Sequence, residues 1–459
     1  MKFSSTLLFA AGLVSASVFA DDNQDLVSKG KYLATAADCA ACHNGTDAQR
    51  SAFAGGYTID SPMGKIIASN ITPSKQFGIG NYTEQQFADA LRKGIAADGS
   101  HLYPAMPYTA YQGLTDADVK ALYAYFMHGV KAVDKAPTEK TELAFPFSVR
   151  QAMFGWNLLY TDAKPFEAPQ GMAANVAHGK YLSDVLAHCG TCHTPRNAMM
   201  AEDNSQYLAG GSLGGWFAPN ITSDKESGIG NWSQLQLEQY LKIGSVPNLS
   251  QAGGPMAEAV EHSFRFLTDS DIRDIAAYIK QVPAIHTATA KVRSGAAPAV
   301  KDINQVITGQ GEQKTLADSS TVDGAKLYDN ACASCHGRNG QGTADHFYPS
   351  LTSNTTVTAA LPNNLVMAIS HGLSRKGNDV DVLMPAFGRD MSDAQIAAVS
   401  NYVRLHFGNI DDGLTAKDVA NITSGGPAPF LVRYINLLMA LGVVIISLVL
   451  FALFRRKKR

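Results

Sequence analysis

The motif Cys-x-x-Cys-His occurs three times in this chain and accounts for every cysteine that the chain contains. The six cysteines form the pairs Cys39 and Cys42, Cys189 and Cys192, and Cys332 and Cys335. A histidine directly after the second cysteine is the signature of c-type haem attachment. A thioredoxin-like redox pair needs a βαβ setting and no particular histidine, and a zinc site needs other spacings to complete four ligands. We therefore predict three haem c groups, bound covalently through these cysteines.

Each motif histidine is predicted to be one axial ligand of a haem iron, and these are His43, His193 and His336. The opposite ligand decides what the haem does, because a methionine thioether raises the reduction potential and closes the iron to small molecules. Equivalent positions of the three repeats offer Met106, Met256 and Met384. We expect each to lie in a proline-containing loop just before the last helix of its repeat. Rival ligands are Met63, Met127, Met199, Met200, Met367 and Met391, which are expected to fill cores, and His101 and His262.

The second ring nitrogen of each motif histidine needs a hydrogen-bond acceptor, which fixes the ring and tunes the iron. The segments "SNI", "PNI" and "YPSL" occupy matching positions after the three motifs. We expect the acceptors to be the backbone carbonyls of Ser69, Pro219 and Pro349.

Internal repetition extends well beyond the motifs. "GKYLATAADCAACH" matches "GKYLSDVLAHCGTCH", and "SNITPSKQFGIGNY" matches "PNITSDKESGIGNW", both at an offset of about 150 residues. Each repeat ends with an amphipathic helix opened by an N-cap residue, as in "LTDADVKALYAYF". Three small helical domains follow, and a covalently held porphyrin would supply much of the buried apolar surface that such small domains lack.

The two ends of the chain carry different targeting signals. Residues 1–20 have a lysine, an apolar stretch and a small-x-small site, which predicts a secretory signal peptide. Residues 430–454 contain an apolar run long enough to cross a bilayer, followed by the basic tail 455–459, which predicts a single-pass inner-membrane anchor with a cytoplasmic C-terminus. The part between is acidic, with 31 Lys and Arg against 40 Asp and Glu, so nucleic acid is not an expected partner.

The segments between the repeats differ in composition. The first is aromatic and is predicted to pack across the domain junction, with a docking surface for a partner as the alternative. The second is looser, the third spans the distance to the membrane, and the Asn-Ile-Thr triplets are read as structural. The predicted organisation is a signal peptide at 1–20, cytochrome c domains at 21–135, 171–285 and 319–410, linkers at 136–170, 286–318 and 411–429, a transmembrane helix at 430–454 and a tail at 455–459.

These motifs, with "LYPAMPY", "FPFSVRQAMFGWNLL" and the C-terminal anchor, resemble the tri-haem cytochrome c subunits of bacterial membrane-bound dehydrogenases. That family includes the cytochrome subunits of gluconate 2-dehydrogenase, quinoprotein alcohol dehydrogenase and fructose or sorbitol dehydrogenase. The resemblance covers essentially the whole mature chain. It implies an all-α fold of three tandem class I cytochrome c domains plus one C-terminal transmembrane helix.

The resemblance also implies partners. A separate catalytic subunit with flavin or pyrroloquinoline quinone would oxidise gluconate, a sugar or an alcohol in the periplasm, and this chain would pass the electrons to ubiquinone at the inner membrane. A small third subunit is an additional candidate. No Gly-x-Gly-x-x-Gly fingerprint in a strand-to-helix setting is present, so no catalytic residue is predicted here. Two alternatives stay open: a haem enzyme such as a peroxidase, and an electron-delivery subunit of a terminal oxidase.

Overall fold

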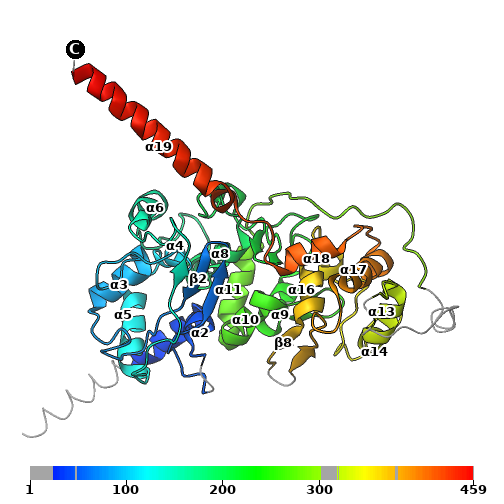
Figure 1. Cartoon of the computed structure of the whole chain (residues 1–459). Helices are drawn as coiled ribbons and strands as arrows, with labels where there is room; N and C mark the ends of the chain where they lie inside the picture. The colour runs from blue at the N-terminus through cyan, green and yellow to red at the C-terminus, as the bar shows by residue number, and fades with distance from the viewer. Residues whose placement is uncertain (1–23, 47–48, 301–317, 319, 378–380, 458–459) are drawn as a thin grey trace, which may run out of the picture.

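The computed structural model describes residues 24–46, 49–300, 318, 320–377 and 381–457. The predicted signal peptide lies outside these described residues, as does most of the C-terminal half of the second linker. The chain forms three mostly helical units in a row, and one long helix rises from one side of the row (Figure 1). We call residues 24–129 unit one, residues 174–279 unit two and residues 324–408 unit three.

The helices of the three units follow one plan: a leading helix, a short helix that carries the Cys-x-x-Cys-His motif, and a closing helix. Unit one has a leading helix over residues 24–36, then α2 (Cys39–His43), α3 (Glu84–Lys93), α4 (Tyr108–Tyr111), α5 (Asp116–Ala124) and the π-helical turn η1 (Tyr125–Gly129). Unit two has α7 (Ala174–Tyr181), η2 (Leu182–Leu186), α8 (Cys189–His193), η3 (Asn204–Gln206), α9 (Gln234–Ile243), α10 (Gly254–His262), η4 (Phe264–Phe266) and α11 (Asp269–Ile279). Unit three has α13 (Gly324–Ala331), α14 (Ala333–His336), α15 (Thr355–Thr358), α16 (Asn363–His371) and α17 (Asp393–Gly408).

The prediction of an all-α chain is met only in part, because short antiparallel strands connect the helices. They are β1 (Thr58–Ser61), β2 (Gly64–Ile67) and β3 (Glu142–Leu143) in one sheet, and the pairs β4 (Gly211–Leu213) with β5 (Trp216–Ala218), β6 (Ser245–Val246) with β7 (Ser250–Gln251), and β8 (Leu373–Arg375) with β9 (Val382–Met384). Tight turns within long loops form these strands, and their residues have no long alternating pattern that would predict them.

The predicted N-caps of the closing helices are confirmed. The side chains of Thr115, Thr268 and Ser392 each accept a hydrogen bond from the backbone amide three residues later, at the start of α5, α11 and α17. Such caps satisfy amide groups that have no partner inside the helix. The closing helices therefore begin where the local sequence predicts.

A glycine lies where the leading helix crosses the closing helix in every unit. A Cβ atom added there would collide with a backbone carbonyl of the closing helix: Gly30 with Ala121, Gly179 with Asp274 and Gly324 with Ala398. The two backbones touch at this crossing, and only a residue without a side chain allows that approach. The glycine of "GKYL" and "GAKL" is therefore a packing requirement of the repeat.

Replacing Gly179 with alanine is expected to destabilise the protein by about 1–3 kcal/mol or more, because the methyl group would push α7 off α11. The measurement is the unfolding midpoint of the haem-loaded chain. Gly155→Ala is the matched control, because nothing lies within 4 Å of a Cβ at this helical position. Equal midpoints for Gly179→Ala and the unchanged protein would contradict this account of the crossing.

Units one and two share one continuous core, which contains the leading and closing helices of both. Their contacts are reciprocal: the hydroxyl of Tyr32 in unit one donates to Asp271 in unit two, and the hydroxyl of Tyr181 in unit two donates to Asp118 in unit one. Two repeats that exchange the same pair of contacts are arranged like the halves of a symmetric dimer. The two units therefore form one rigid pair.

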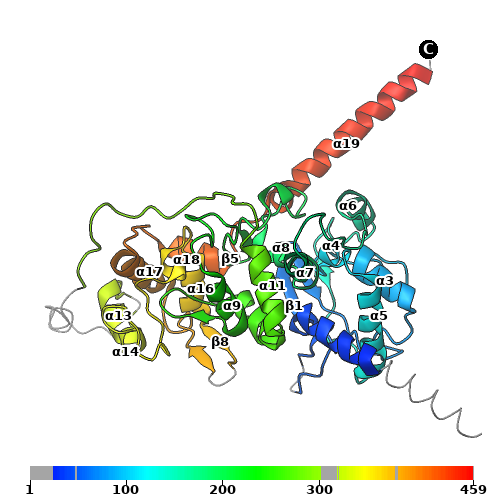
Figure 2. The same cartoon turned by 180° about the vertical axis from the view of Figure 1, so that it is seen from behind.

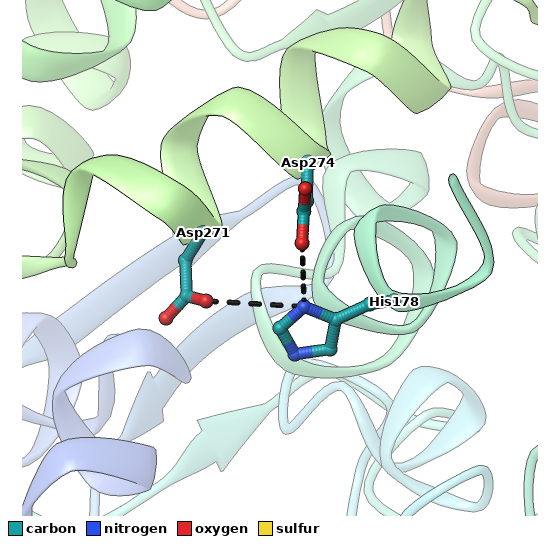
Figure 3. A group of neighbouring side chains, drawn as sticks. All are labelled: His178, Asp271 and Asp274. Carbon is teal, nitrogen blue, oxygen red and sulfur yellow. Dashed lines mark hydrogen bonds and ion pairs between the residues drawn. The ribbon is translucent and has the colours of Figure 1, made fainter. Parts of the chain in front are cut away.

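Asp271 also contributes to the packing of α7 on α11. Figure 3 shows His178 of α7 directed at Asp271 and Asp274 of α11, with its Nδ1 atom 3.8 Å and 2.9 Å from their nearer carboxylate oxygens. Asp271 thus connects the closing helix of unit two both to its own leading helix and to unit one.

Unit three has its own core, against which Trp216 of unit two packs, and the two units also meet through polar contacts. The side chain of Arg375 on β8 is buried and donates to the carbonyl of Ala252 at 2.9 Å. The side chain of Asn364 exchanges two hydrogen bonds with the backbone of Phe217, at 2.9 Å and 2.8 Å. Unit two therefore lies between the other two units, as both views show (Figures 1 and 2).

Two of the predicted linkers contain a helix. The first contains α6 (Ala152–Tyr160), whose Trp156 donates through Nε1 to the carbonyl of Met199 in unit two, so the predicted packing across the junction is confirmed. The third contains α18 (Ala416–Thr423), which packs its Val419 into the core of unit three. That segment is therefore not a simple spacer, and only the residues after α18 lead to the last helix.

The last helix, α19 (Phe430–Lys457), has no buried residue and projects away from the three units (Figure 1). Its 28 residues span roughly 42 Å, which exceeds the thickness of about 30 Å of a bilayer core. Within the part of the chain that the structure describes, it is the one helix whose length and composition suit a membrane span.

Candidate haem-binding sites

The six motif cysteines lie on or at the start of the short helices α2, α8 and α14, and none of them forms a disulfide. Burial raises the pKa of the Cys39 thiol to about 12 and that of Cys189 to about 12. Reactive or metal-binding cysteines are thiolates with lowered pKa values. The environment of Cys39 and Cys189 is therefore unlike that of a reactive redox pair, and it is compatible with thioether attachment of haem.

The predicted hydrogen bonds of the motif histidines are confirmed in all three units. The Nδ1 atom lies 2.8 Å from the carbonyl oxygen of Ser69 for His43, 2.7 Å from that of Pro219 for His193, and 2.9 Å from that of Pro349 for His336. Burial lowers the pKa of each of these histidines, so the neutral ring is favoured. A neutral ring that donates through Nδ1 keeps Nε2 for a metal, as in metal-ligating histidines.

The backbone of each motif histidine is held in the same way in all three units. Its carbonyl accepts a hydrogen bond from the amide of a glycine in the following loop: Gly55 for His43, Gly210 for His193 and Gly342 for His336, at 2.8, 2.7 and 2.7 Å. Contacts within the protein therefore fix both the ring and the main chain of each histidine.

The acceptor carbonyls are positioned by buried asparagines in units one and two. Asn70 is 3% exposed, its amide donates to the carbonyls of Val133 and Lys135, and its Oδ1 atom accepts from the amide and hydroxyl of Thr72. Asn220 makes the equivalent bonds to Ile285 and Thr222. The structural reading of these two triplets is confirmed, because their amides are buried and already bonded.

Unit three reaches the same geometry with a different residue. Ser350 follows Pro349, is buried, and donates to the carbonyl of Gly340 at 3.2 Å. It also lies 2.9 Å from the hydroxyl of Thr352. A serine thus replaces the asparagine as the residue that holds the acceptor loop in place.

The candidate methionines lie in three different local settings. Met106 lies in a proline-flanked loop before α4, as expected. The expectation of a loop is wrong for Met256, which lies in the first turn of α10, and for Met384, which is the last residue of β9. All three are half-buried against the cores, whereas the rivals Met367 and Met391 are core residues and Met199 is 43% exposed.

Among the rival histidines, His101 has contacts with α6. Its Nδ1 atom lies 3.3 Å from the side-chain amide of Asn157, and its ring makes an edge contact with Phe154. This histidine belongs to the junction between unit one and α6, so its placement gives no support for a role as an axial ligand.

The motif regions of units one and two lie close together at the interface between the units. The hydroxyl of Tyr111 donates to the carbonyl of Ala37 at 2.8 Å, and its ring contacts the ring of His188 with the centroids 5.6 Å apart. Burial raises the pKa of Cys192 to about 11, and the carboxylate of Asp38 in unit one adds to the rise. No feature of the local sequence predicts these contacts between the units, because Tyr111 lies 77 positions from His188 and Asp38 lies 154 positions from Cys192.

Comparison with known proteins defines the class first. The cytochrome c family model matches the chain three times, over residues 27–129, 176–283 and 321–406. Each match contains one Cys-x-x-Cys-His motif with its bonded histidine. The chain is therefore built from cytochrome c units, with covalently bound haem c at the three motifs.

Relatives similar over nearly the whole chain identify the family within the cytochromes c. The chain is 46% identical to the fructose dehydrogenase cytochrome subunit of Gluconobacter japonicus, over 94% of this chain and 92% of the relative. It is 37% identical to the gluconate 2-dehydrogenase cytochrome c subunit of Pantoea cypripedii, over 91% and 94%. It is 35% identical to the cytochrome c subunit of the quinone-dependent alcohol dehydrogenase of Gluconobacter oxydans, over 93% and 89%. The chain belongs to this family of cytochrome c subunits of bacterial dehydrogenases.

Proposed function

We propose that this chain is the tri-haem electron-transfer and membrane-anchoring subunit of a dehydrogenase complex. The observation that carries the proposal is the threefold repetition of a fixed motif histidine, in three units arranged in a row beside a helix long enough to span a membrane. Haem iron supplies one-electron transfer when bound. The residues of the chain hold the iron ligands still, which keeps the rearrangement on electron transfer small.

The proposed haem sites follow the repeats. Each haem is attached through the two cysteines of its motif, and the axial pairs are His43 with Met106, His193 with Met256, and His336 with Met384. The proposed domains are residues 21–135, 171–285 and 319–410, with linkers at 136–170, 286–318 and 411–429. Support for the methionines comes from their half-buried placement at the edge of each core.

The arrangement of the units favours a linear path for electrons. Units one and two share a core and touch where Tyr111 of unit one contacts His188 beside the motif of unit two, and unit two also carries the contacts to unit three. Unit two is therefore the central relay in our proposal, because an electron that moves between units one and three passes it.

We further propose the location of each part. Residues 1–20 are removed as a signal peptide, residues 430–454 cross the inner membrane, and residues 455–459 remain in the cytoplasm. The haem units then lie in the periplasm. The absence of a buried face on α19 supports this assignment, because a helix that is apolar all round and unpacked is suited to lipid.

The proposed electron donor is a catalytic subunit with flavin or pyrroloquinoline quinone that oxidises gluconate, a sugar or an alcohol, and the acceptor is ubiquinone. The names of the relatives support a dehydrogenase partner of this kind. A small third subunit completes the proposed complex.

The test uses membranes from a strain that lacks this chain. We expect the membranes to lose fructose-, gluconate- or ethanol-dependent reduction of ubiquinone, while the catalytic subunit still reduces a soluble artificial acceptor. Restoring the full chain is expected to restore quinone reduction. Unchanged quinone reduction with all three substrates would contradict the proposal. A terminal oxidase found in the purified native complex would favour the alternative of an electron-delivery subunit for that oxidase.

A further inference from the structure

Helix α6 is apolar on both of its faces. Its inner face packs on unit one: Trp156 is 7% exposed, its ring contacts that of Tyr108 with the centroids 6.2 Å apart, and Asn157 binds the hydroxyl of Tyr108 at 2.8 Å. This face explains why the helix forms and how it is fixed. It does not explain the residues on the other side.

In the part of the chain that the structure describes, the outer face carries three large apolar side chains that are mostly exposed, although the ring of Phe154 makes an edge contact with His101. Leu158 is 76% exposed, Leu159 is 68% exposed and Phe154 is 65% exposed, and a Cβ at Gly155 between them would meet open space. We call Phe154, Leu158 and Leu159 the α6 patch. Single exposed apolar side chains are ordinary on a protein surface. Three large ones on one short helix form an apolar surface that lowers solubility and favours a partner.

Helix α6 lies on the side of the molecule from which α19 leaves. Figures 1 and 2, which differ by half a turn, both show α6 on the upper side with the start of α19. Trp156 of α6 bonds the carbonyl of Met199 in unit two, and the turn at Gly214 in unit two lies near Gly425, just before α19. Helix α6, which carries the patch, thus lies on the same side of the molecule as the start of the membrane helix.

The charges around the patch favour a lipid surface. Residues 144–161 contain one cation, Arg150, and no Asp or Glu, although the part of the chain before α19 is acidic overall. The guanidinium of Arg150 is held near the patch by a bond to the carbonyl of His101 at 2.8 Å and by the ring of Tyr103. An apolar face beside a cation suits an interface with anionic headgroups. The exposed Asp98 is the carboxylate whose charge interacts with that of Arg150.

We propose that the α6 patch is a second membrane contact, which inserts into the outer leaflet of an anionic bilayer beside α19. The proposal rests on the proposed function in one respect, since it takes α19 as the transmembrane anchor. A single helix would leave the haem units free to swing about its root. A second contact through α6 fixes their tilt, so that units one and two are held at a constant height above the membrane.

The test places one spin label at a time on the full chain in vesicles of phosphatidylcholine and phosphatidylglycerol. All six native cysteines lie in haem motifs, so an introduced cysteine is the thiol that reacts. The variants are Leu158→Cys in the patch, Leu383→Cys as a matched control on β9, and Val443→Cys in α19. Leu383 is 72% exposed, and its hairpin lies on the lower side in Figure 1, away from α19.

We expect the label at 158 to be open to oxygen dissolved in lipid and shielded severalfold from a water-soluble nickel complex, with the reverse at 383. Unchanged haem absorption confirms folding, and Leu159→Cys repeats the measurement at a second position. A label at 158 that is open to the nickel complex while the label at 443 is in lipid overturns this inference alone. A label at 443 in water overturns the anchor proposal instead. Shielding at 158 that appears only with the catalytic subunit assigns the patch to a protein partner and also overturns the inference.

Discussion

A chain with Cys332 and Cys335 replaced by alanine is expected to be produced with two haems, whereas the same change at Cys189 and Cys192 is expected to cost more than one. Unit three has its own core, so the loss of its haem leaves the other two units intact. Units one and two share a single core, and Tyr111 of unit one contacts His188 beside the motif of unit two, so a collapsed unit two withdraws support from unit one. Small domains of this size depend on their cofactor for buried apolar surface.

The measurement for both variants is the ratio of haem to protein by alkaline pyridine spectra, together with the mass of the intact chain. Both variants are expected to abolish ubiquinone reduction by the complex if electrons pass all three haems, so the haem count and not the activity separates them. Equal loss of one haem in the two variants would contradict the coupling of units one and two.

Replacing Met106 with leucine is expected to remove the methionine-to-iron absorption band of one haem and to lower its reduction potential. The substitution conserves volume, so the core of unit one is expected to stay packed. Axial ligands set haem potentials over a range of ~0.8 V, and the loss of the thioether is expected to move this haem by a sizeable part of that range. The measurement is a spectroelectrochemical titration of the purified chain.

Met127→Leu is the matched control, because Met127 is also half-buried against the same core. It is expected to keep all three potentials and the full absorption band. If Met127→Leu, and not Met106→Leu, removed the band, the assignment of the sixth ligand in unit one would be wrong. The absorption band and the reduction potentials test Met256 in the same way, through Met256→Leu. This residue lies in a helix and not in the expected loop.

Local sequence patterns predicted the features that local chemistry determines. The caps of the closing helices, the carbonyl partners of the motif histidines and the structural role of Asn70 and Asn220 all follow from short segments whose side chains bond nearby backbone. Repetition at a constant offset strengthened each of these predictions, because the same bonds had to form in two similar segments.

Contacts between distant segments could not be predicted in this way. The reciprocal bonds of Tyr32 with Asp271 and of Tyr181 with Asp118 join different units. Helix α18 packs on unit three through Val419, although its segment is predicted only to span the distance to the membrane. Helix α10 around Met256 and the short strands depend on how the long loops close over each unit. Their positions follow from tertiary packing, which overrides weak local propensity.

The most direct test of the central claim is the mass of the intact chain purified from native membranes. We predict one species that carries three covalently bound haems and has no thiol left to react with an alkylating reagent. A mature chain with fewer than three haem adducts, or with a cysteine pair open to alkylation, would contradict the account of three haem units in one polypeptide.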